Sequence, residues 1–250
     1  MSEPELRDLV AIVAAMEEEI APLRERLQSP RQLADGPRRY TEGVLRGVPV
    51  VLAVTGEGKR NADLGIRCVI QKCRPTRVLV LGLAGALSAE LIVGELLVSS
   101  EVMEEDTILG WPDLQWLEEA NLRSDYELGR IITVDQILST PDSKLQWWGR
   151  TIRDQPAVAD MESACFARVA IAYNLPYLIV RAVSDSATET LPAFLEDCRS
   201  QDGRIDRRQV MWKAFWRPRS WGILFKQHRR MRKLTVELAD FAEGLIVAVA

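Results

Sequence analysis

The stretch that decides the fold is residues 158–188, VADMESACFARVAIAYNLPYLIVRAVSDSAT. Residues 162–173 carry apolar side chains at helical spacing and predict a helix, which Asn174 and Pro176 end. Residues 177–183 form a short, largely β-branched apolar run and predict a buried strand. A helix that leads directly into a buried strand is typical of an α/β protein.

Polar side chains flank both predicted elements. Asp160 and Glu162 lie at the start of the helix, and Arg181, Ser184 and Asp185 lie in or just after the strand. In open α/β sheets, ligands bind at the carboxyl ends of strands, so these groups could converge on one pocket. The same spacing fits a simpler alternative, with a capping acid before the helix and Asp185 in a turn. Spacing alone leaves both interpretations open.

Strand and helix patterns alternate through residues 9–188, which predicts a largely parallel or mixed sheet covered by helices. The predicted strands are 9–15, 48–54, 77–81, 94–98, 130–134 and 177–183. Helices are predicted after residue 16, after the turn at 55–58, after residue 144 and over residues 162–173. Residues 29–47 fit a loop or a hairpin, and residues 107–129 are loop-like.

Composition narrows the classes of protein. With 250 residues, 47% hydrophobic and 27% charged, the chain suits one α/β domain spanning 1–250. No apolar run approaches the roughly 20 residues of a membrane span, and the acidic N-terminus lacks the order of a signal peptide, so we expect a cytoplasmic protein. The four cysteines show no CxxC spacing, so neither a zinc site nor a disulfide framework is indicated, and no cofactor is expected.

The chain contains one histidine, His228. Neither a Ser-His-Asp triad nor a multi-histidine metal site can be built from it. If the protein is an enzyme, acid–base chemistry falls to carboxylates.

The charge is unevenly distributed. Residues 199–233 hold twelve Lys and Arg against two Asp, although the whole chain has a net charge of −4. Aromatic residues are interleaved with these bases, at Trp212, Phe215, Trp216, Trp221 and Phe225. Residues 191–233 are therefore interpreted as a basic-aromatic helical insertion, with helices near 206–216 and 220–246. It fits an amphipathic cap with a solvated basic face, or peripheral contact of 207–233 with anionic lipid. The acidic remainder argues against nucleic acid.

Four stretches, in order, resemble the nucleoside phosphorylase and nucleosidase superfamily, and most closely its 5′-methylthioadenosine/S-adenosylhomocysteine nucleosidase branch. They are IVAAMEEEIAPL (12–23), VTGEGKRNA (54–62), GLAGALSAELIVGELLVSSEV (82–102) and ADMESACFARVAIAYNLPYLIVRAVSDSA (159–187). The resemblance implies a three-layer α/β/α fold around a curled mixed sheet, with a C-terminal helical extension. It also implies cleavage of a purine nucleoside at the ribosyl N-glycosidic bond, by water or phosphate, and a homodimer.

The resemblance implies three catalytic residues. Asp185 matches the aspartate that protonates purine N7, and Glu19 matches the glutamate that activates water. Arg181 matches an arginine close to the nucleophile. The alternative for Glu19 is purely structural, because acids in the first turn of a helix suit its dipole. To act as an acid, Asp185 must hold a proton near neutral pH, which requires desolvation or a nearby negative charge.

The resemblance also implies substrate-binding residues. Met161 and Glu162 match the ribose clamp, and Ser184 matches the residue that orients the aspartate. Further substrate-binding positions are Met16, Leu83 and Gly85. No metal ligand is expected.

Three features depart from the nucleosidase pattern. Leu83 replaces a serine in a GSAGG-like run, and Glu57 replaces an apolar residue in a GIGK-like turn. The long C-terminal segment is more like that of the hopanoid-associated phosphorylases, whose substrate carries a hydrophobic polycyclic tail.

Three functions follow from these features. The leading hypothesis is a hydrolytic purine nucleosidase for 5′-modified adenosines, because a carboxylate at Glu19 would repel phosphate. The alternative is a phosphorylase or nucleosidase for a lipid-linked adenosyl compound such as adenosylhopane. A non-catalytic nucleoside-binding protein on the same scaffold is the third.

Overall fold

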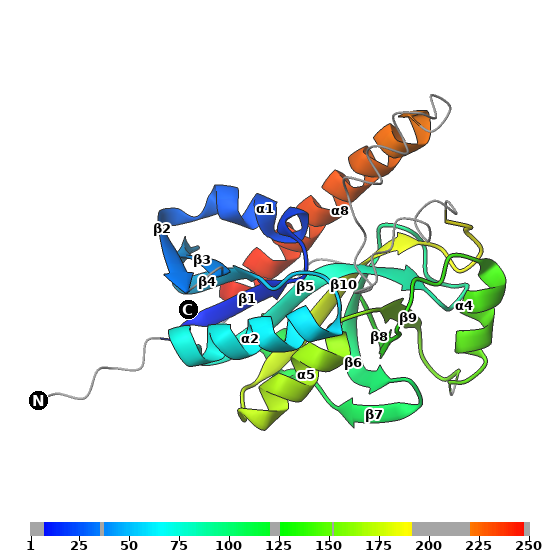
Figure 1. Ribbon diagram of the computed structural model, residues 1–250, viewed down its shortest axis with the longest axis horizontal. Helices are drawn as coiled ribbons and strands as arrows, with labels where there is room; N and C mark the ends of the chain where they lie inside the picture. Colours follow the sequence, from blue (N-terminus) through cyan, green and yellow to red (C-terminus); the bar gives the residue numbers. More distant parts are fainter. Residues whose placement is uncertain (1–7, 36–37, 121–125, 152, 192–220, 248–250) are drawn as a thin grey trace, which may run out of the picture.

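The fold is built on a mixed sheet, which has ten strands in the described part of the chain (Figure 1). The computed structural model describes residues 8–35, 38–120, 126–151, 153–191 and 221–247. Four parallel strands form its centre: β1 (Val10–Ala14), β4 (Val48–Val54), β5 (Arg77–Ala86) and β10 (Tyr177–Asp185). These strands are almost continuously apolar because helices cover both of their faces.

The sheet closes on β5. The first residues of β5 pair with β1, its last two residues pair with β9 (Ala157–Asp160), and its other edge pairs with β10. From β10 the sheet continues through β6 (Leu96–Glu104) and β8 (Glu127–Thr133) back to β9. Five strands therefore form a closed ring, and the curled mixed sheet is confirmed.

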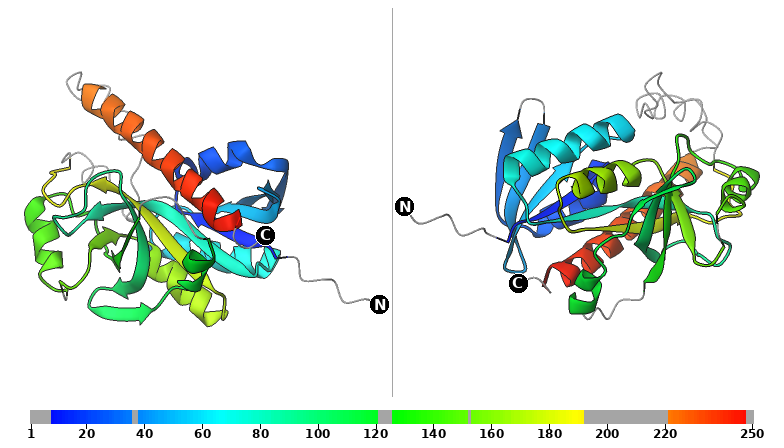
Figure 2. Two further views of the ribbon diagram at one scale, coloured as in Figure 1. Left: turned by 180° about the vertical axis from the view of Figure 1, so that it is seen from behind. Right: turned by 90° about the horizontal axis from the view of Figure 1, so that it is seen from below.

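Helices pack on both faces of the sheet (Figure 2). On one face lie α2 (Lys59–Cys73) and α5 (Ser163–Ala172), which bury one apolar cluster. On the other face lie α1 (Glu17–Arg26), α3 (Gln115–Ala120) and α8 (Trp221–Val247), which bury a second cluster. A further helix, α4 (Pro141–Trp148), lies at the ring end of the sheet (Figure 1). The three-layer prediction is thereby confirmed.

Several short elements differ from the sequence-based expectation. Residues 107–129 are not simply a loop, because β7 (Thr107–Gly110) pairs with β6, and α3 follows it. Trp116 anchors α3 by burying its ring and donating from Nε1 to the Leu245 carbonyl, 3.0 Å away. β9 was not predicted. Of the two alternatives for residues 29–47, the structure shows the hairpin, formed by β2 (Gln28–Asp35) and β3 (Arg38–Leu45).

The C-terminal helix is present as α8, close to the predicted span 220–246. Its inner face packs on the sheet through a row of buried apolar side chains: Leu234, Leu238, Phe241, Ala242 and Leu245. The predicted helix near 206–216, with Trp212, Phe215 and Trp216, lies outside the described residues. Within the described ranges, no helix combines the length and apolar character needed to cross a membrane.

Candidate functional site

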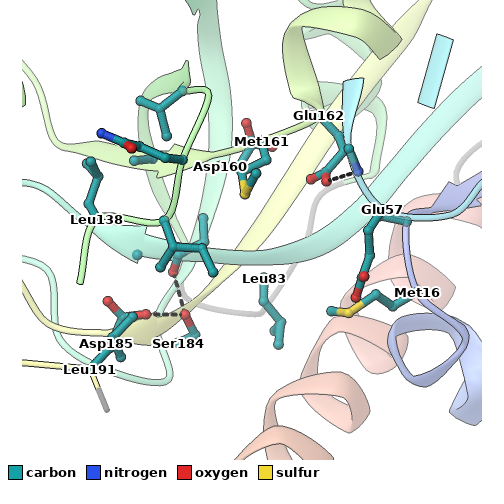
Figure 3. Close-up of a pocket in the computed structure, with 18 of the residues that line it drawn as sticks. Met16, Glu57, Leu83, Leu138, Asp160, Met161, Glu162, Ser184, Asp185 and Leu191 are labelled. Atoms are coloured by element: carbon teal, nitrogen blue, oxygen red, sulfur yellow. Dashed lines mark hydrogen bonds between the residues drawn. The ribbon is translucent and has the colours of Figure 1, made fainter. Parts of the chain in front are cut away.

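A cavity of about 240 Å³ opens where β1, β5 and β10 end (Figure 3). This is the edge at which ligands bind in α/β sheets. Eight of the nine predicted site residues line it: Met16, Glu19, Leu83, Gly85, Met161, Glu162, Ser184 and Asp185. The ninth, Arg181, lies behind the cavity wall and is 1% exposed.

Asp185 lies at one end of the cavity, where β10 stops. Its Oδ1 accepts a hydrogen bond from Ser184 Oγ at 2.5 Å, and this hydroxyl also lies 3.1 Å from the Ala84 carbonyl. A Cβ on residue 85 would lie 2.9 Å from Asp185 Oδ2, so the glycine lets β5 pass beside the carboxylate. Ser184 therefore contacts the carboxylate that the family resemblance implies it orients.

Lys144 is a site residue that the sequence reasoning missed. Its side chain reaches from α4 into the cavity wall, and Nζ donates to Asp185 Oδ2 at 2.5 Å. The residue is 1% exposed. In the sequence it belongs to PDSKLQWW, where a lysine would normally be read as solvated. Asp185 is buried, which is one of the two conditions that an acid role requires, but its charged neighbour is a cation rather than an anion.

Glu162 lies across the cavity from Asp185 (Figure 3). Its Oε1 accepts a hydrogen bond from the Gly58 N–H at 2.7 Å, in the turn before α2. Gly58 has φ = 84°, a conformation that favours glycine. Burial, reinforced by the charge of Asp160, raises the pKa of Glu162 to about 7. A carboxyl poised there can accept hydrogen bonds from ligand hydroxyls.

Glu19 is the inward-facing member of the three acids at the start of α1. Its two oxygens accept from the Met16 N–H at 2.8 Å and the Leu83 N–H at 3.0 Å. The first contact is half of a capping box, which agrees with the structural interpretation, and Glu19 also lines the cavity, where the functional interpretation requires it. Burial raises the pKa of Glu19, although Arg181 and the backbone donors oppose the shift. Glu17, by contrast, points outward and pairs with Arg24.

Arg181 is buried behind the cavity wall and contacts two residues near the start of α5. Its Nη2 donates to Ser163 Oγ at 2.7 Å and lies 2.6 Å from Asp160 Oδ2. A side chain on residue 82 would collide with this guanidinium, so Gly82 makes room for it. Asp160 also accepts from Thr133 Oγ1 at 2.7 Å and from the Ser163 N–H. Asp160 therefore accepts from the first N–H of α5, as the simpler alternative of a capping acid proposed, and it also balances a buried cation.

The two sequence departures both lie in the cavity. Leu83 contributes an apolar side chain to the wall, while its N–H still binds Glu19. Glu57 extends alongside Met16, on the side away from Asp185 (Figure 3). The loop after β8 adds an apolar wall that the sequence reasoning did not assign to the site, at Val134, Ile137 and Leu138.

Comparisons with known proteins agree with this geometry. Residues 9–202 match the family model of the phosphorylase superfamily. The 5′-methylthioadenosine/S-adenosylhomocysteine nucleosidase of Geobacillus kaustophilus is 33% identical over 199 residues, which are 72% of this chain and 85% of that protein.

Solved structures show the same fold. That of the methylthioadenosine/S-adenosylhomocysteine nucleosidase of Colwellia psychrerythraea, in complex with adenine, matches with a TM-score of 0.74 at 20% identity and covers 97% of this chain and 96% of that one. The futalosine hydrolase of Helicobacter pylori matches with a TM-score of 0.74 at 18% identity over 98% and 99% of the two chains. From its motifs, its closed mixed sheet and these matches, the chain belongs to the phosphorylase superfamily.

Proposed function

We propose that the protein is a purine nucleosidase that hydrolyses the N-glycosidic bond of 5′-modified adenosines. The observation that carries the proposal is the charge of the cavity. Five carboxylates line it: Glu19, Glu57, Asp160, Glu162 and Asp185. Two of these charges are offset, since Lys144 in the cavity wall pairs with Asp185 and Arg181 behind the wall pairs with Asp160. Such a cavity attracts a cationic transition state and repels phosphate.

The placement of the carboxylates suggests how a nucleoside would lie. The purine would face Asp185, and the ribose hydroxyls would meet Glu162 and Met161 on the opposite side (Figure 3). Glu19, held by two backbone donors, would take the proton of a water that attacks the anomeric carbon. Positive charge that develops on the ribose as the bond breaks would be stabilised by these carboxylates.

Arg181 would act indirectly in this scheme. Its guanidinium is engaged by Asp160 and Ser163, and the side chain is buried behind the cavity. It lowers the pKa of Glu19 against the effect of burial, so it favours the ionised base. A phosphorylase would need a cation facing the nucleophile, and Arg181 is already committed elsewhere.

The relatives support the substrate class. The similar proteins from several bacteria are methylthioadenosine/S-adenosylhomocysteine nucleosidases, and a structural neighbour is a futalosine hydrolase. The first name describes a nucleosidase, and the second describes a hydrolase. We therefore place the protein among the enzymes that cleave N-glycosidic bonds rather than among binding proteins.

The test measures purine release from methylthioadenosine, S-adenosylhomocysteine, adenosine and inosine, each with and without phosphate. We expect phosphate-independent adenine release, and a loss of about 100-fold or more in Glu19→Gln, since general-base catalysis contributes about 10²–10⁴. The matched control is Glu17→Gln, in the same helical turn but solvent-facing and paired with Arg24.

Release that requires phosphate would refute hydrolysis and favour a phosphorylase. Full activity in Glu19→Gln would refute the assigned base, and binding of all four nucleosides without turnover would refute catalysis. Homodimer formation and membrane contact through 207–233 stay predictions. Light scattering and co-sedimentation with anionic vesicles test them.

A further inference from the structure

Lys144 is the one buried lysine in the described part of the chain, and it touches the residue proposed to protonate the leaving base. Its Nζ has three acceptors: Asp185 Oδ2 at 2.5 Å, the Ser186 carbonyl at 2.6 Å and the Glu189 carbonyl at 3.2 Å. Burial of a lysine is costly unless the group is paired, so this arrangement calls for an explanation.

The contacts of Lys144 and Asp185 fit a pair of opposite charges. An ammonium has three donors and no acceptor, which matches three oxygen acceptors, whereas a neutral amine has only two donors. Asp185 accepts from Lys144 on one oxygen and lies 2.5 Å from the Ser184 hydroxyl on the other. An ionised carboxylate is acceptor-only, so both contacts suit it. The resting pair is Lys144 ammonium and Asp185 carboxylate.

Other charged groups face this pair. The Glu189 side chain is paired with Arg230 of α8 at 2.8 Å, which lowers the pKa of Glu189 and leaves its backbone carbonyl to Lys144. Across the cavity lie Glu162 and Glu19. Among the described side chains, Asp185 is the carboxylate that accepts a hydrogen bond from the Lys144 ammonium, so it is the group placed to share its proton.

A carboxylate cannot protonate a leaving base unless it first receives a proton. Resting on the proposed function, we propose that Lys144 is a positioning residue that also stores the proton which Asp185 delivers. Ser184 and the two backbone carbonyls hold the pair in place, and β5 passes beside it at Gly85. The acid of this enzyme is then the Lys144–Asp185 pair rather than a protonated aspartic acid.

Protons and electrons are conserved over the reaction. The bond between the anomeric carbon and the purine breaks, and its electron pair goes to the base. The base takes a proton from Asp185, whose carboxylate takes one from the Lys144 ammonium and leaves a neutral amine. Water bonds to the anomeric carbon and loses a proton to Glu19. Transfer of that proton through solvent to Lys144 restores both groups.

Two variants separate proton storage from simple positioning. Lys144→Arg keeps a positive charge next to Asp185, but a guanidinium in a protein does not give up its proton. Lys144→Met removes the charge and keeps much of the apolar stem. The control is Lys72→Met, an exposed lysine at the end of α2. Each variant is assayed on methylthioadenosine and on 4-nitrophenyl β-D-riboside, whose leaving group departs without a proton.

We expect both Lys144 variants to lose about 100-fold or more in kcat on methylthioadenosine, with KM changed less than about threefold. On the nitrophenyl riboside they should stay within about threefold of the unsubstituted protein, which also shows that they are folded. The pH profile adds a second readout. Without Lys144 the proton must be held by Asp185 itself, so the rate of Lys144→Met should begin to fall at a different pH from that of the parent.

Three outcomes would overturn the proposal. These are a Lys144→Arg variant with the parent rate and pH profile, an equal loss on both substrates, and a Lys144→Met profile that stays in the parent's position. Each leaves the proposed function in place. Failure of the parent protein to release base from any riboside would instead overturn the proposed function, and the inference with it.

Discussion

Replacing Glu162 with glutamine should make the protein more stable above neutral pH. Burial and the charge of Asp160 raise the pKa of Glu162 from 4.5 to about 7 in the folded protein. The folded state therefore binds a proton more tightly than the unfolded state, and the free energy of unfolding falls as the pH rises from about 4.5 to 7. A glutamine has no proton to lose, and its amide oxygen can still accept from the Gly58 N–H.

The size of the effect follows from the pKa. At about 1.4 kcal/mol for each pH unit between the two values, a fully buried carboxyl would cost about 3 kcal/mol at pH 8. Part of Glu162 faces the cavity, so solvent screens its charge and we expect about 1–3 kcal/mol. For a chain of this length, that corresponds to a Tm increase of about 2–10 °C.

The assay is urea denaturation of the parent and Glu162→Gln at pH 4.5 and pH 8, with Glu25→Gln as an exposed control on α1. The quantity compared is the difference in free energy of unfolding between the two proteins at each pH. The change of this difference with pH excludes any effect of the amide that does not depend on ionisation. The same difference in free energy of unfolding at both pH values would refute a raised pKa of Glu162 in the folded protein. The same variant should release purine more slowly, because it loses the anionic acceptor for the ribose hydroxyls.

Three further substitutions give distinct outcomes. Asp185→Asn should lower adenine release from methylthioadenosine by about 100-fold or more while calorimetry still detects nucleoside binding; unchanged turnover would exclude Asp185 as the proton donor. Arg181→Met should lower the free energy of unfolding by about 3–5 kcal/mol, because it leaves Asp160 as a buried, unpaired charge; a urea midpoint unchanged at pH 7 would contradict this. Glu57→Ile should raise the ratio of kcat/KM for methylthioadenosine to kcat/KM for S-adenosylhomocysteine by several-fold. The reason is that the substitution removes an anion that attracts the ammonium group of S-adenosylhomocysteine. An unchanged ratio would show that Glu57 does not face the 5′ group.

Much of the fold could be predicted from local patterns. The helix that ends before Asn174 and the strand that begins at Tyr177 both follow from apolar spacing and from the residues that stop a helix. The four family-like stretches indicated the curled sheet and predicted the residues that meet in the cavity. Short elements were missed or misjudged, because β7, β9 and α3 are each only four to six residues long and depend on partners from elsewhere in the chain.

The candidate site was also predictable only in part from the sequence. By itself, the sequence determined which chemical groups the site could use, since its family-like stretches carry Glu19, Glu162 and Asp185, and the single histidine leaves acid–base chemistry to carboxylates. Only the tertiary structure decided the charges these groups carry. It placed Lys144, 41 residues away in the chain, against Asp185, and it buried Arg181 behind the cavity with Asp160. The physical reason is that a local pattern records burial along one element, whereas the ionisation of a buried group depends on the neighbours that distant elements bring to it.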